Sequence, residues 1–346
     1  MALSSIFPES LKVRGRFIKR QLFEEPPAIS RNDVNLHGKT AIVTGSNTGL
    51  GFECSRQLLS LGLSKLILAV RDKAKGEAAK KELVGQNTEG VVIEVWELDL
   101  SVYDSILKFV ERTKTLERID IVVLNASVVK FSLQHNPNTG HDEVIQVNCL
   151  STYLLTILLL PVLKKKKGNQ SQNPSRLVIV TSDTVDWAIF REKEARPLLP
   201  AFDKPEYFDD QDRYPTSKLL GQLFLTELVK RVPPSVAIIN APNPGLCYGT
   251  GLNKDADGTL TGFILHLMCS ILGRSPAVGA RAITDAAVNH GEESHGRRLE
   301  CGQLYDMPPF IYTPEGQQIA QLLWQETIDE LSFACVGEII DRELRQ

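Results

Sequence analysis

The stretch TAIVTGSNTGLG, residues 40–51, places three glycines between an apolar run and the start of a helical pattern. A strand, a glycine turn and a helix in this order form the context of a phosphate-binding loop. Gly45 allows the tight turn, Gly49 leaves room for a pyrophosphate against the backbone, and Gly51 lets the helix pack close to the sheet. Free N–H groups at the helix start then bind the anion. The predicted phosphate loop consists of Gly45, Ser46, Asn47, Thr48, Gly49, Leu50 and Gly51.

Length and charge narrow the class of protein. A chain of 346 residues is long enough for one large α/β domain with additions, and a net charge of −3 argues against binding to nucleic acid. The six cysteines lie far apart without C-x-x-C spacing, so we expect reduced thiols and no metal site. No signal peptide is visible, and the longest apolar run, Tyr153 to Leu163, is shorter than the about 20 residues that span a bilayer. We therefore expect a cytoplasmic protein.

Short apolar runs alternate with helical patterns along the chain. This rhythm predicts an α/β fold, a Rossmann-type doubly wound parallel sheet with helices on both faces, in a single domain. The expected strands cover residues 40–43, 66–70, 91–98, 119–124, 177–180 and 236–240, and a long helix covers 142–163. The expected organisation is an N-terminal extension (1–37), a main domain (38–312) with a substrate lid at about 246–275, and a C-terminal helical extension (313–346).

Two segments outside this rhythm have further expected roles. Leu11 to Phe23 mixes apolar and basic residues, so it is expected to form an amphipathic helix. That helix either lies on a membrane surface or, as we favour, packs on the body of the protein or on a partner subunit. The apolar helix around Phe263 to Met268 follows a flexible segment beyond the sixth strand. It is well placed to be a lid, and its apolar character favours a hydrophobic small-molecule substrate.

An arginine stands at the carboxyl end of the second expected strand, where ligands bind in sheets of this kind. The preceding position holds Val70 and not the carboxylate that would accept ribose hydroxyls. The guanidinium of Arg71 can pair with a 2′-phosphate and stack on adenine, although a solvated surface arginine is the alternative. Asp72 lies one residue later than the position of the ribose carboxylate. Its presence nevertheless keeps binding of a ribose hydroxyl open as an alternative.

Tyr214 and Lys218 are four residues apart at the start of an expected helix, so their side chains share one face. Pro215 fits only if Tyr214 opens the helix. A free tyrosine has a pKa near about 10, and a neighbouring ammonium and a cationic cofactor ring both lower the pKa of the phenol. This pair is therefore a candidate for acid–base chemistry.

These motifs in their order resemble the short-chain dehydrogenase/reductase family over about residues 38–290. The resemblance rests on T-G-x-x-x-G-x-G at 44–51, Asn125-Ala126-Ser127, Y-x-x-x-K at 214–218 and Asn243-Pro244-Gly245. The chain looks like a single-domain member with retinol-dehydrogenase-like features. It also looks like fungal relatives that are often tied to secondary-metabolite pathways.

The resemblance implies NADP(H) as cofactor, since Arg71 at its position goes with NADP in the family. In the family, Asp99 and Leu100 lie around the adenine, Asn125 ties the central strands together, and Ala126 lies near the cofactor. Ser127 replaces a family glycine beside the nicotinamide ribose, and we expect its Cβ to be tolerated. The implied contacts at the nicotinamide end are Pro244, Gly245, Thr250, Tyr214 and Lys218.

The resemblance also implies a catalytic set. Tyr214 passes the proton, Lys218 tunes it and holds the nicotinamide ribose, Ser182 orients the substrate oxygen, and Asn148 holds a water of a proton relay. Ser182 precedes Tyr214 by more residues than is usual in the family, because a polar stretch, Asp183 to Asp212, is inserted. We expect this insertion to loop out at low cost without moving the strand end.

The main hypothesis is an NADP(H)-dependent oxidoreductase that interconverts a ketone or aldehyde and an alcohol on a hydrophobic small molecule, in a biosynthetic pathway. Two alternatives stay open at this point: a cofactor-binding regulator, and a non-redox isomerase or cyclase on the same fold. Pairing through long helices into a homodimer or homotetramer is expected from the family. Peripheral membrane contact through residues 1–37 is a further expectation.

Overall fold

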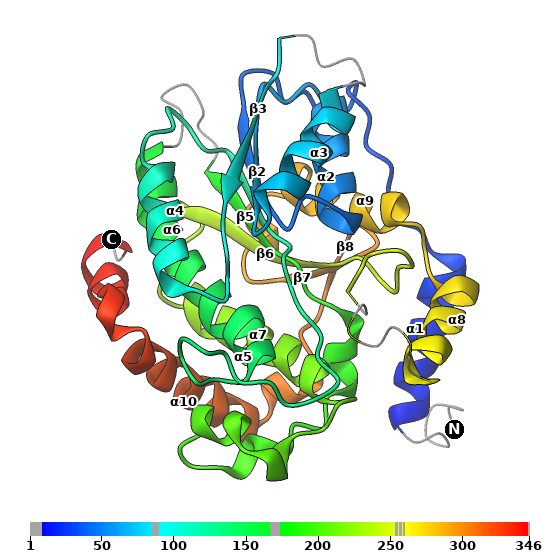
Figure 1. Cartoon of the computed structure of the whole chain (residues 1–346), viewed down its shortest axis with the longest axis vertical. Coiled ribbons are helices and arrows are strands. Elements are labelled where there is room, and N and C mark those ends of the chain that lie inside the picture. The colour runs from blue at the N-terminus through cyan, green and yellow to red at the C-terminus, as the bar shows by residue number, and fades with distance from the viewer. Residues whose placement is uncertain are drawn as a thin grey trace.

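One mostly parallel sheet forms the centre of the protein. The computed structural model describes residues 9–84, 90–166, 174–252, 255, 258 and 260–344. The strand order is β3-β2-β1-β4-β5-β6-β7-β8, and helices lie on both sides of the sheet (Figure 1). The predicted α/β doubly wound sheet is confirmed. The strands are β1 (Thr40–Thr44), β2 (Lys65–Val70), β3 (Val92–Glu97), β4 (Ile121–Leu124), β5 (Ser175–Ile179), β6 (Ala237–Asn243), β7 (Arg298–Glu300) and β8 (Gln303–Tyr305).

Two apolar layers explain why the strands are continuous hydrophobic runs. Ala41 and Val43 of β1 pack in one buried cluster, and Ile42 between them packs in the other. Successive side chains of a strand point to opposite faces, so both faces of the sheet are buried. Helices α2 (Gly49–Ser60), α3 (Lys73–Val84) and α9 (Pro276–Val288) cover the first face. Helices α4 (Tyr103–Thr113), α6 (Thr152–Lys166), α7 (Arg213–Val229) and α10 (Pro314–Glu330) contribute to the second cluster.

The far edge of the sheet departs from the all-parallel expectation. Strand β7, around Leu299, pairs with β6 in parallel. The unexpected β8 pairs with β7 in the antiparallel direction. The two residues between them, Cys301 and Gly302, have φ angles of 48° and 78°. Positive φ at both loop positions is typical of a tight hairpin turn, which explains the reversal.

The long helix expected over 142–163 is interrupted. It consists of α5 (Glu143–Ile145), a π-helical turn (Gln146–Ser151) and α6. The carboxylate of Asp142 begins it by accepting hydrogen bonds from the N–H groups of Val144 and Ile145. The whole segment is apolar and long enough to cross a membrane, but 89% of its most apolar window is buried inside the protein. The predicted reading as a buried helix therefore agrees with the structure.

The N-terminal helix α1 (Glu9–Phe23) packs on the body of the protein. The ring of Phe17 meets the edge of the Trp187 ring, with centroids 5.1 Å apart, and Gln21 is buried. This agrees with the favoured alternative. Leu22 and Phe23 are exposed on the other side of the helix, and membrane contact stays a prediction.

The insertion between β5 and α7 is not the solvated surface loop that was expected. It folds into short 3-10 turns, the first of which is η3 (Asp183–Trp187), and its side chains Phe190, Leu198 and Phe202 are buried. The carboxylate of Glu326 on α10 accepts hydrogen bonds from the N–H groups of Leu198 and Leu199, at 2.8 and 2.7 Å. The insertion is a packed wall because its scattered apolar residues find partners on the C-terminal helix.

The expected lid contains helix α8 (Leu260–Leu272), which Figure 1 places near α1 at one side of the molecule. The side chains of residues 263–266, at the centre of the predicted apolar face, lie outside the described part. Of the described side chains on α8, Leu267, Met268 and Ile271 are exposed. Closure of this helix over a ligand stays a prediction. The chain ends in α10, α11 (Val336–Glu338) and a π-helical turn (Ile339–Leu344).

Candidate active site

A cavity of about 280 Å³ lies beyond the carboxyl ends of the central strands. Sheets of this type bind ligands at this edge, because the strand order reverses between β1 and β4. The cavity brings together residues that are up to two hundred positions apart in the sequence. The predicted site residues that line it are Gly45, Asn47, Thr48, Leu50, Arg71, Asp99, Leu100, Asn125, Ala126, Tyr214, Lys218 and Thr250.

The other predicted site residues are not among those that line this cavity. They are Ser46, Gly49, Gly51, Asn148, Ser182, Pro244 and Gly245. Gly49 packs against Thr250, and a Cβ added to Gly49 would lie 3.0 Å from the Cα of Thr250. The hydroxyl of Ser46 is buried and has no hydrogen-bond partner among the described residues. Of these residues, Gly49 and Gly51 lie directly behind cavity-lining residues, namely Thr250 and Gly45.

The glycine loop has the geometry that a phosphate requires. Gly45 and Gly49 have φ angles of 63° and 59°, which favour glycine. A Cβ on Gly51 would lie 2.5 Å from the carbonyl oxygen of Gly45, so only glycine lets α2 start this close to the loop. Thr48 gives no side-chain cap to α2, and the first turn carries no acidic residue. The free N–H groups and the helix dipole therefore suit a bound anion.

Arg71 lies at the end of β2 with an exposed side chain, and no hydrogen bond or ion pair joins it to another described residue. Asp72, the alternative ribose carboxylate, is used elsewhere. Its Oδ1 accepts a hydrogen bond from the N–H of Lys75 at 3.1 Å, and its Oδ2 lies 3.3 Å from Nζ of Lys75. This carboxylate begins α3 and does not line the cavity. The donors at this end therefore fit a phosphate better than a free ribose hydroxyl.

Asn125 and Asp99 fix the strand ends on the two sides of the cavity. Nδ2 of Asn125 donates to the carbonyl oxygen of Thr44 at 3.0 Å, so it joins β4 to β1. Oδ1 of Asp99 accepts hydrogen bonds from the N–H and the hydroxyl of Ser101, at 2.9 and 2.6 Å. The carboxylate of Asp99 therefore stabilises the turn before α4, and Asp99 also lines the cavity.

Tyr214 and Lys218 lie in the first turns of α7, which begins at Arg213, so Pro215 is accommodated as expected. Nζ of Lys218 lies 5.6 Å from the centroid of the Tyr214 ring and donates a hydrogen bond to the carbonyl oxygen of Val180 at 3.1 Å. Desolvation lowers the pKa of Lys218 to about 8. The ammonium therefore loses its proton close to neutral pH, unlike an ordinary lysine.

The expected lowering of the tyrosine pKa by its neighbours is wrong for the protein alone. Desolvation and the carboxylate of Asp183 raise the pKa of Tyr214, and a hydrogen bond with Ser182 opposes this only in part. The ammonium of Lys218 faces Val180 and lies above the ring. At neutral pH the phenol of Tyr214 is therefore protonated and able to donate.

Ser182 and Tyr214 meet despite the long insertion between them, as the hydrogen bond between their side chains requires. Ser182 also begins η3 by accepting a hydrogen bond from the N–H of Thr184 at 3.3 Å. The two ends of the insertion are thus close in space, so the insertion does not displace the strand end, as expected. A hydroxyl beside a protonated phenol provides two donors for one substrate oxygen.

Asn148 sits in the π-helical turn, and such turns are frequent at functional sites. Its Nδ2 donates to the carbonyl oxygen of Val128 and to the hydroxyl of Ser217, at 2.9 and 3.1 Å. Its Oδ1 accepts from the hydroxyl of Ser127 at 2.9 Å. The Ser127 hydroxyl thus has a partner in the protein, and its tolerance beside a nicotinamide ribose stays a prediction. A small cavity of about 20 Å³, lined by Asn148 and Lys218 among others, is large enough for about one water molecule.

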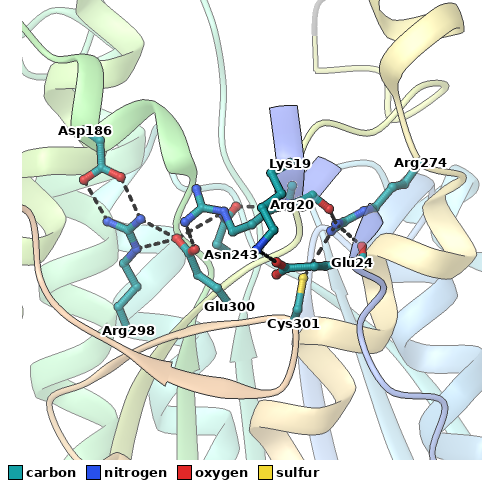
Figure 2. Close-up of polar contacts among 10 residues, drawn as sticks. Lys19, Arg20, Glu24, Asp186, Asn243, Arg274, Arg298, Glu300 and Cys301 are labelled. Carbon is teal, nitrogen blue, oxygen red and sulfur yellow. Dashed lines mark hydrogen bonds and ion pairs between the residues drawn. The ribbon is translucent and has the colours of Figure 1, made fainter. Parts of the chain in front are cut away.

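Sequence reasoning missed a group of buried charges behind the tyrosine. Asp183 is buried, and desolvation together with the nearby Glu300 raises the pKa of its carboxyl to about 6. Arg298 and Arg20 carry the compensating positive charge. Figure 2 shows Arg20 and Arg298 on either side of Glu300, with Asn243 beside it. The sequence signal that could have pointed to this group is the position of Asp183, which directly follows Ser182 after a strand end.

A second, wider cavity of about 660 Å³ adjoins the first turn of α7 through Pro215. Its apolar wall consists of Phe131, Trp187, Ile189 and Phe208. Acidic residues follow at its rim, where the insertion returns to α7. These are Asp209, Asp210 and Asp212, with the neutral Gln211 among them. This wall comes from the insertion and from the segment after β4, and the sequence motifs do not mark it.

Comparison with known proteins agrees with this geometry. The family model of short chain dehydrogenases matches residues 39–185. The chain is 46% identical over 332 residues to "Short-chain dehydrogenase fogG" of Aspergillus ruber, covering 94% of each chain. It is 45% identical over 323 residues to "Short chain dehydrogenase/reductase mfmJ" of Annulohypoxylon moriforme, covering 93% of each.

Solved structures show the same fold at lower identity. An uncharacterised protein of Mycobacterium paratuberculosis superimposes with a TM-score of 0.62 at 23% identity, covering 88% of this chain and 98% of that one. The NADP-bound 3-oxoacyl (acyl-carrier-protein) reductase of Agrobacterium tumefaciens gives 0.59 at 19% identity, covering 78% and 95%. From the coverage and identity of the fungal relatives, together with the glycine loop and the Tyr214–Lys218 pair, the chain belongs to the short-chain dehydrogenase/reductase family, whose members are oxidoreductases.

Proposed function

We propose that the protein is an NADP(H)-dependent oxidoreductase that interconverts a ketone or aldehyde and an alcohol on a hydrophobic small molecule. The observation that carries this proposal is the shared cavity, which has Arg71 and the glycine loop at one end and Tyr214 with Lys218 at the other. A nicotinamide dinucleotide that reacts with a carbonyl or an alcohol needs an anion site and an acid–base site at opposite ends of one cavity. The two ends come from β1–β2 and from α7, and one cavity connects them.

The choice of NADP(H) rests on Arg71. Its guanidinium has no carboxylate partner among the described residues, and Asp72 is engaged in the start of α3. A free guanidinium pairs well with a 2′-phosphate, in a bidentate manner. Some proteins of the same fold were solved with NADP or NADPH bound, which supports the proposal by analogy only.

In the proposed reaction, the nicotinamide supplies or accepts the hydride when it is bound. Tyr214 donates its phenolic proton to the substrate oxygen during reduction and takes it back during oxidation. The Ser182 hydroxyl orients that oxygen and shares its developing charge. Lys218 holds a positive charge over the tyrosine ring and can pass a proton through the small cavity that it shares with Asn148.

The second cavity is the proposed site for the body of the substrate. Its apolar side chains lie next to Pro215, one residue from the proton donor. The acidic rim disfavours carboxylates and phosphates, because the like charges repel. Asp209 and Asp212 are held by hydrogen bonds within the insertion, and Asp210 is exposed. We therefore expect neutral, largely apolar ketones to react faster than matched ketones that carry a carboxylate.

The proposed function is tested by titrating the protein with NADPH and NADH in parallel, followed by nicotinamide fluorescence. We expect a marked preference for NADPH in the wild type. Arg71→Ala should lose about tenfold or more of the NADPH affinity and keep its NADH affinity, since each charge-assisted contact contributes about 1.5–3 kcal/mol. Asp72→Asn is the matched control next to it, and both affinities should stay unchanged. Preference for NADH would overturn the cofactor assignment, and binding of neither would favour a non-redox role.

The proposal also covers the pathway, the location and the contacts of the protein. The fungal relatives support a place in a secondary-metabolite pathway. Residence in the cytoplasm, peripheral membrane contact through α1 and pairing into a homodimer or homotetramer also belong to the proposal. The exposed Leu22 and Phe23 on α1 are consistent with either contact.

A further inference from the structure

The last turn of α1 holds both ends of the lid segment. Gln21 is 7% exposed, whereas its neighbours Leu22 and Phe23 are 48% and 79% exposed. Its Nε2 donates to the carbonyl oxygens of Leu246 and Leu272, at 2.9 and 2.8 Å. Its Oε1 accepts from the N–H of Leu246 at 3.1 Å. One carboxamide therefore joins the first and the last residues of the 246–272 segment, through both of its donor positions and one acceptor position.

Arg274 completes this junction from the other side. Its Nη2 donates to the carbonyl oxygens of Arg20 and Glu24 at the end of α1, each at 2.7 Å. Its Nη1 donates to the carbonyl oxygen of Pro244 at 3.3 Å. Figure 2 shows the guanidinium of Arg274 meeting the end of α1. Cations at a helix C-terminus satisfy its free carbonyl groups, so α1 and the end of the lid segment stabilise each other.

Backbone pairing closes the neck between these contacts. The N–H of Arg274 donates to the carbonyl oxygen of Leu246 at 2.8 Å, and the N–H of Tyr248 donates to that of Arg274 at 3.1 Å. The two ends of the lid segment thus run side by side for a few residues. Gln21 is hydrogen-bonded to Leu246 in this pairing and to Leu272, two residues before Arg274.

The neck joins Gln21 and Arg274 at Gly245 to the cofactor cavity at Thr250. Gly245 has a φ of 74°, and a Cβ there would lie 2.8 Å from Oε1 of Gln21 and from Nη1 of Arg274. Thr250, four residues after Leu246, packs on Gly49 of the glycine loop and lines the cavity. A displacement of Leu246 is therefore transmitted over a few residues to the wall of the proposed cofactor site.

We propose that Gln21 is a positioning residue of the active site, which fixes the neck of the lid so that Thr250, Gly251 and Leu252 line the cofactor cavity. The proposal rests on the proposed function, because it concerns the same cavity. The N-terminal helix is then a working part of the site, and it is not a detachable extension. Gln21 acts through the segment 244–250, and it touches neither cofactor nor substrate.

The test compares Gln21→Leu with a matched control, Gln57→Leu. Gln57 likewise donates from Nε2 to a carbonyl oxygen, that of Ala277 at 2.7 Å, and accepts from Thr284 at 2.8 Å, but it joins α2 to α9. Both variants should lower the melting temperature, since each loses buried hydrogen bonds. Amide hydrogen exchange on the protein without cofactor should accelerate about tenfold at Leu246, Tyr248 and Arg274 in Gln21→Leu only.

The second readout is cofactor binding. Gln21→Leu should weaken NADPH binding about tenfold, and Gln57→Leu should leave it unchanged. Equal exchange rates at the neck in the two variants, or an equal change in NADPH affinity, would overturn the proposal. If Gln21→Leu fails to fold, Gln21→Met replaces it, because its unbranched chain keeps the length of glutamine. If the wild type binds no nicotinamide cofactor, only the proposed function is overturned. The hydrogen-exchange experiment would still show whether Gln21 fixes the neck.

Discussion

The proposed cofactor and substrate ends of the site, which are two cavities, are built in different ways. The cofactor end consists of short contiguous motifs at strand ends, such as Gly45 to Gly51 and Arg71, held by backbone geometry. The proposed substrate end is the second cavity, whose wall comes mainly from the insertion, which has no motif and is held by buried charges. Arg213 is 1% exposed and lies between the carboxylates of Asp142 and Glu192. The difference predicts that changes at the two ends affect different quantities, namely cofactor affinity, turnover and stability.

The largest expected effect is on turnover. Tyr214→Phe removes the only atom that the tyrosine offers for proton transfer, and general acid–base groups contribute about 100- to 10,000-fold to rates. We expect kcat to fall by about a thousandfold and the NADPH dissociation constant to stay unchanged, measured by steady-state kinetics and fluorescence titration. Undiminished turnover would remove Tyr214 from the mechanism.

The next effect concerns stability at the substrate end. Arg213→Met should lower the free energy of unfolding by about 3 kcal/mol or more, because it leaves two buried carboxylates without a counter-charge. The matched control is Arg118→Met, which removes a more exposed ion pair, because Arg118 is 31% and its partner Asp120 12% exposed. The control should cost about 1 kcal/mol or less. Denaturant unfolding measures both, and similar losses would contradict the contrast between the two ends.

A smaller effect is expected in the pH dependence of stability. His141 contacts Asp203 of the insertion at 3.0 Å and Glu330 of α10 at 3.1 Å, and these carboxylates raise its pKa to about 9. A raised histidine pKa gives stability that is complete below the unfolded value of about 6.5 and is lost as the pH rises through 9. His141→Gln should therefore lower the unfolding free energy at pH 6 by roughly 1–2 kcal/mol, and by much less at pH 10.

This third prediction needs a difference measurement, because Lys218 has the opposite sign. Its pKa is lowered to about 8, so the folded state releases a proton that the unfolded state keeps, and stability rises with pH from about 8 to the ordinary lysine value. Subtracting the curve of His141→Gln from that of the wild type removes the contribution of Lys218. Parallel stability curves for the two proteins would show that His141 does not join the insertion to α10 in solution.

The sequence by itself predicted the doubly wound parallel sheet and the glycine loop, because these depend on local patterns. Short continuous apolar runs that alternate with helical patterns predict a sheet buried on both faces, and the glycines at 45, 49 and 51 predict the loop between β1 and α2. The Tyr214–Lys218 pair followed from helical spacing alone. The elevated pKa of Tyr214 did not, since desolvation and Asp183 act through space.

Only the tertiary structure decided how the remaining segments contribute. The insertion was expected to be a surface loop and instead forms the apolar wall of the second cavity, because Phe190 and Phe202 bury themselves against other parts of the chain. The placement of Gln21 at the neck of the lid joins residues more than two hundred positions apart. Contacts of this kind depend on which surfaces meet after folding, and no local pattern in a single sequence specifies them.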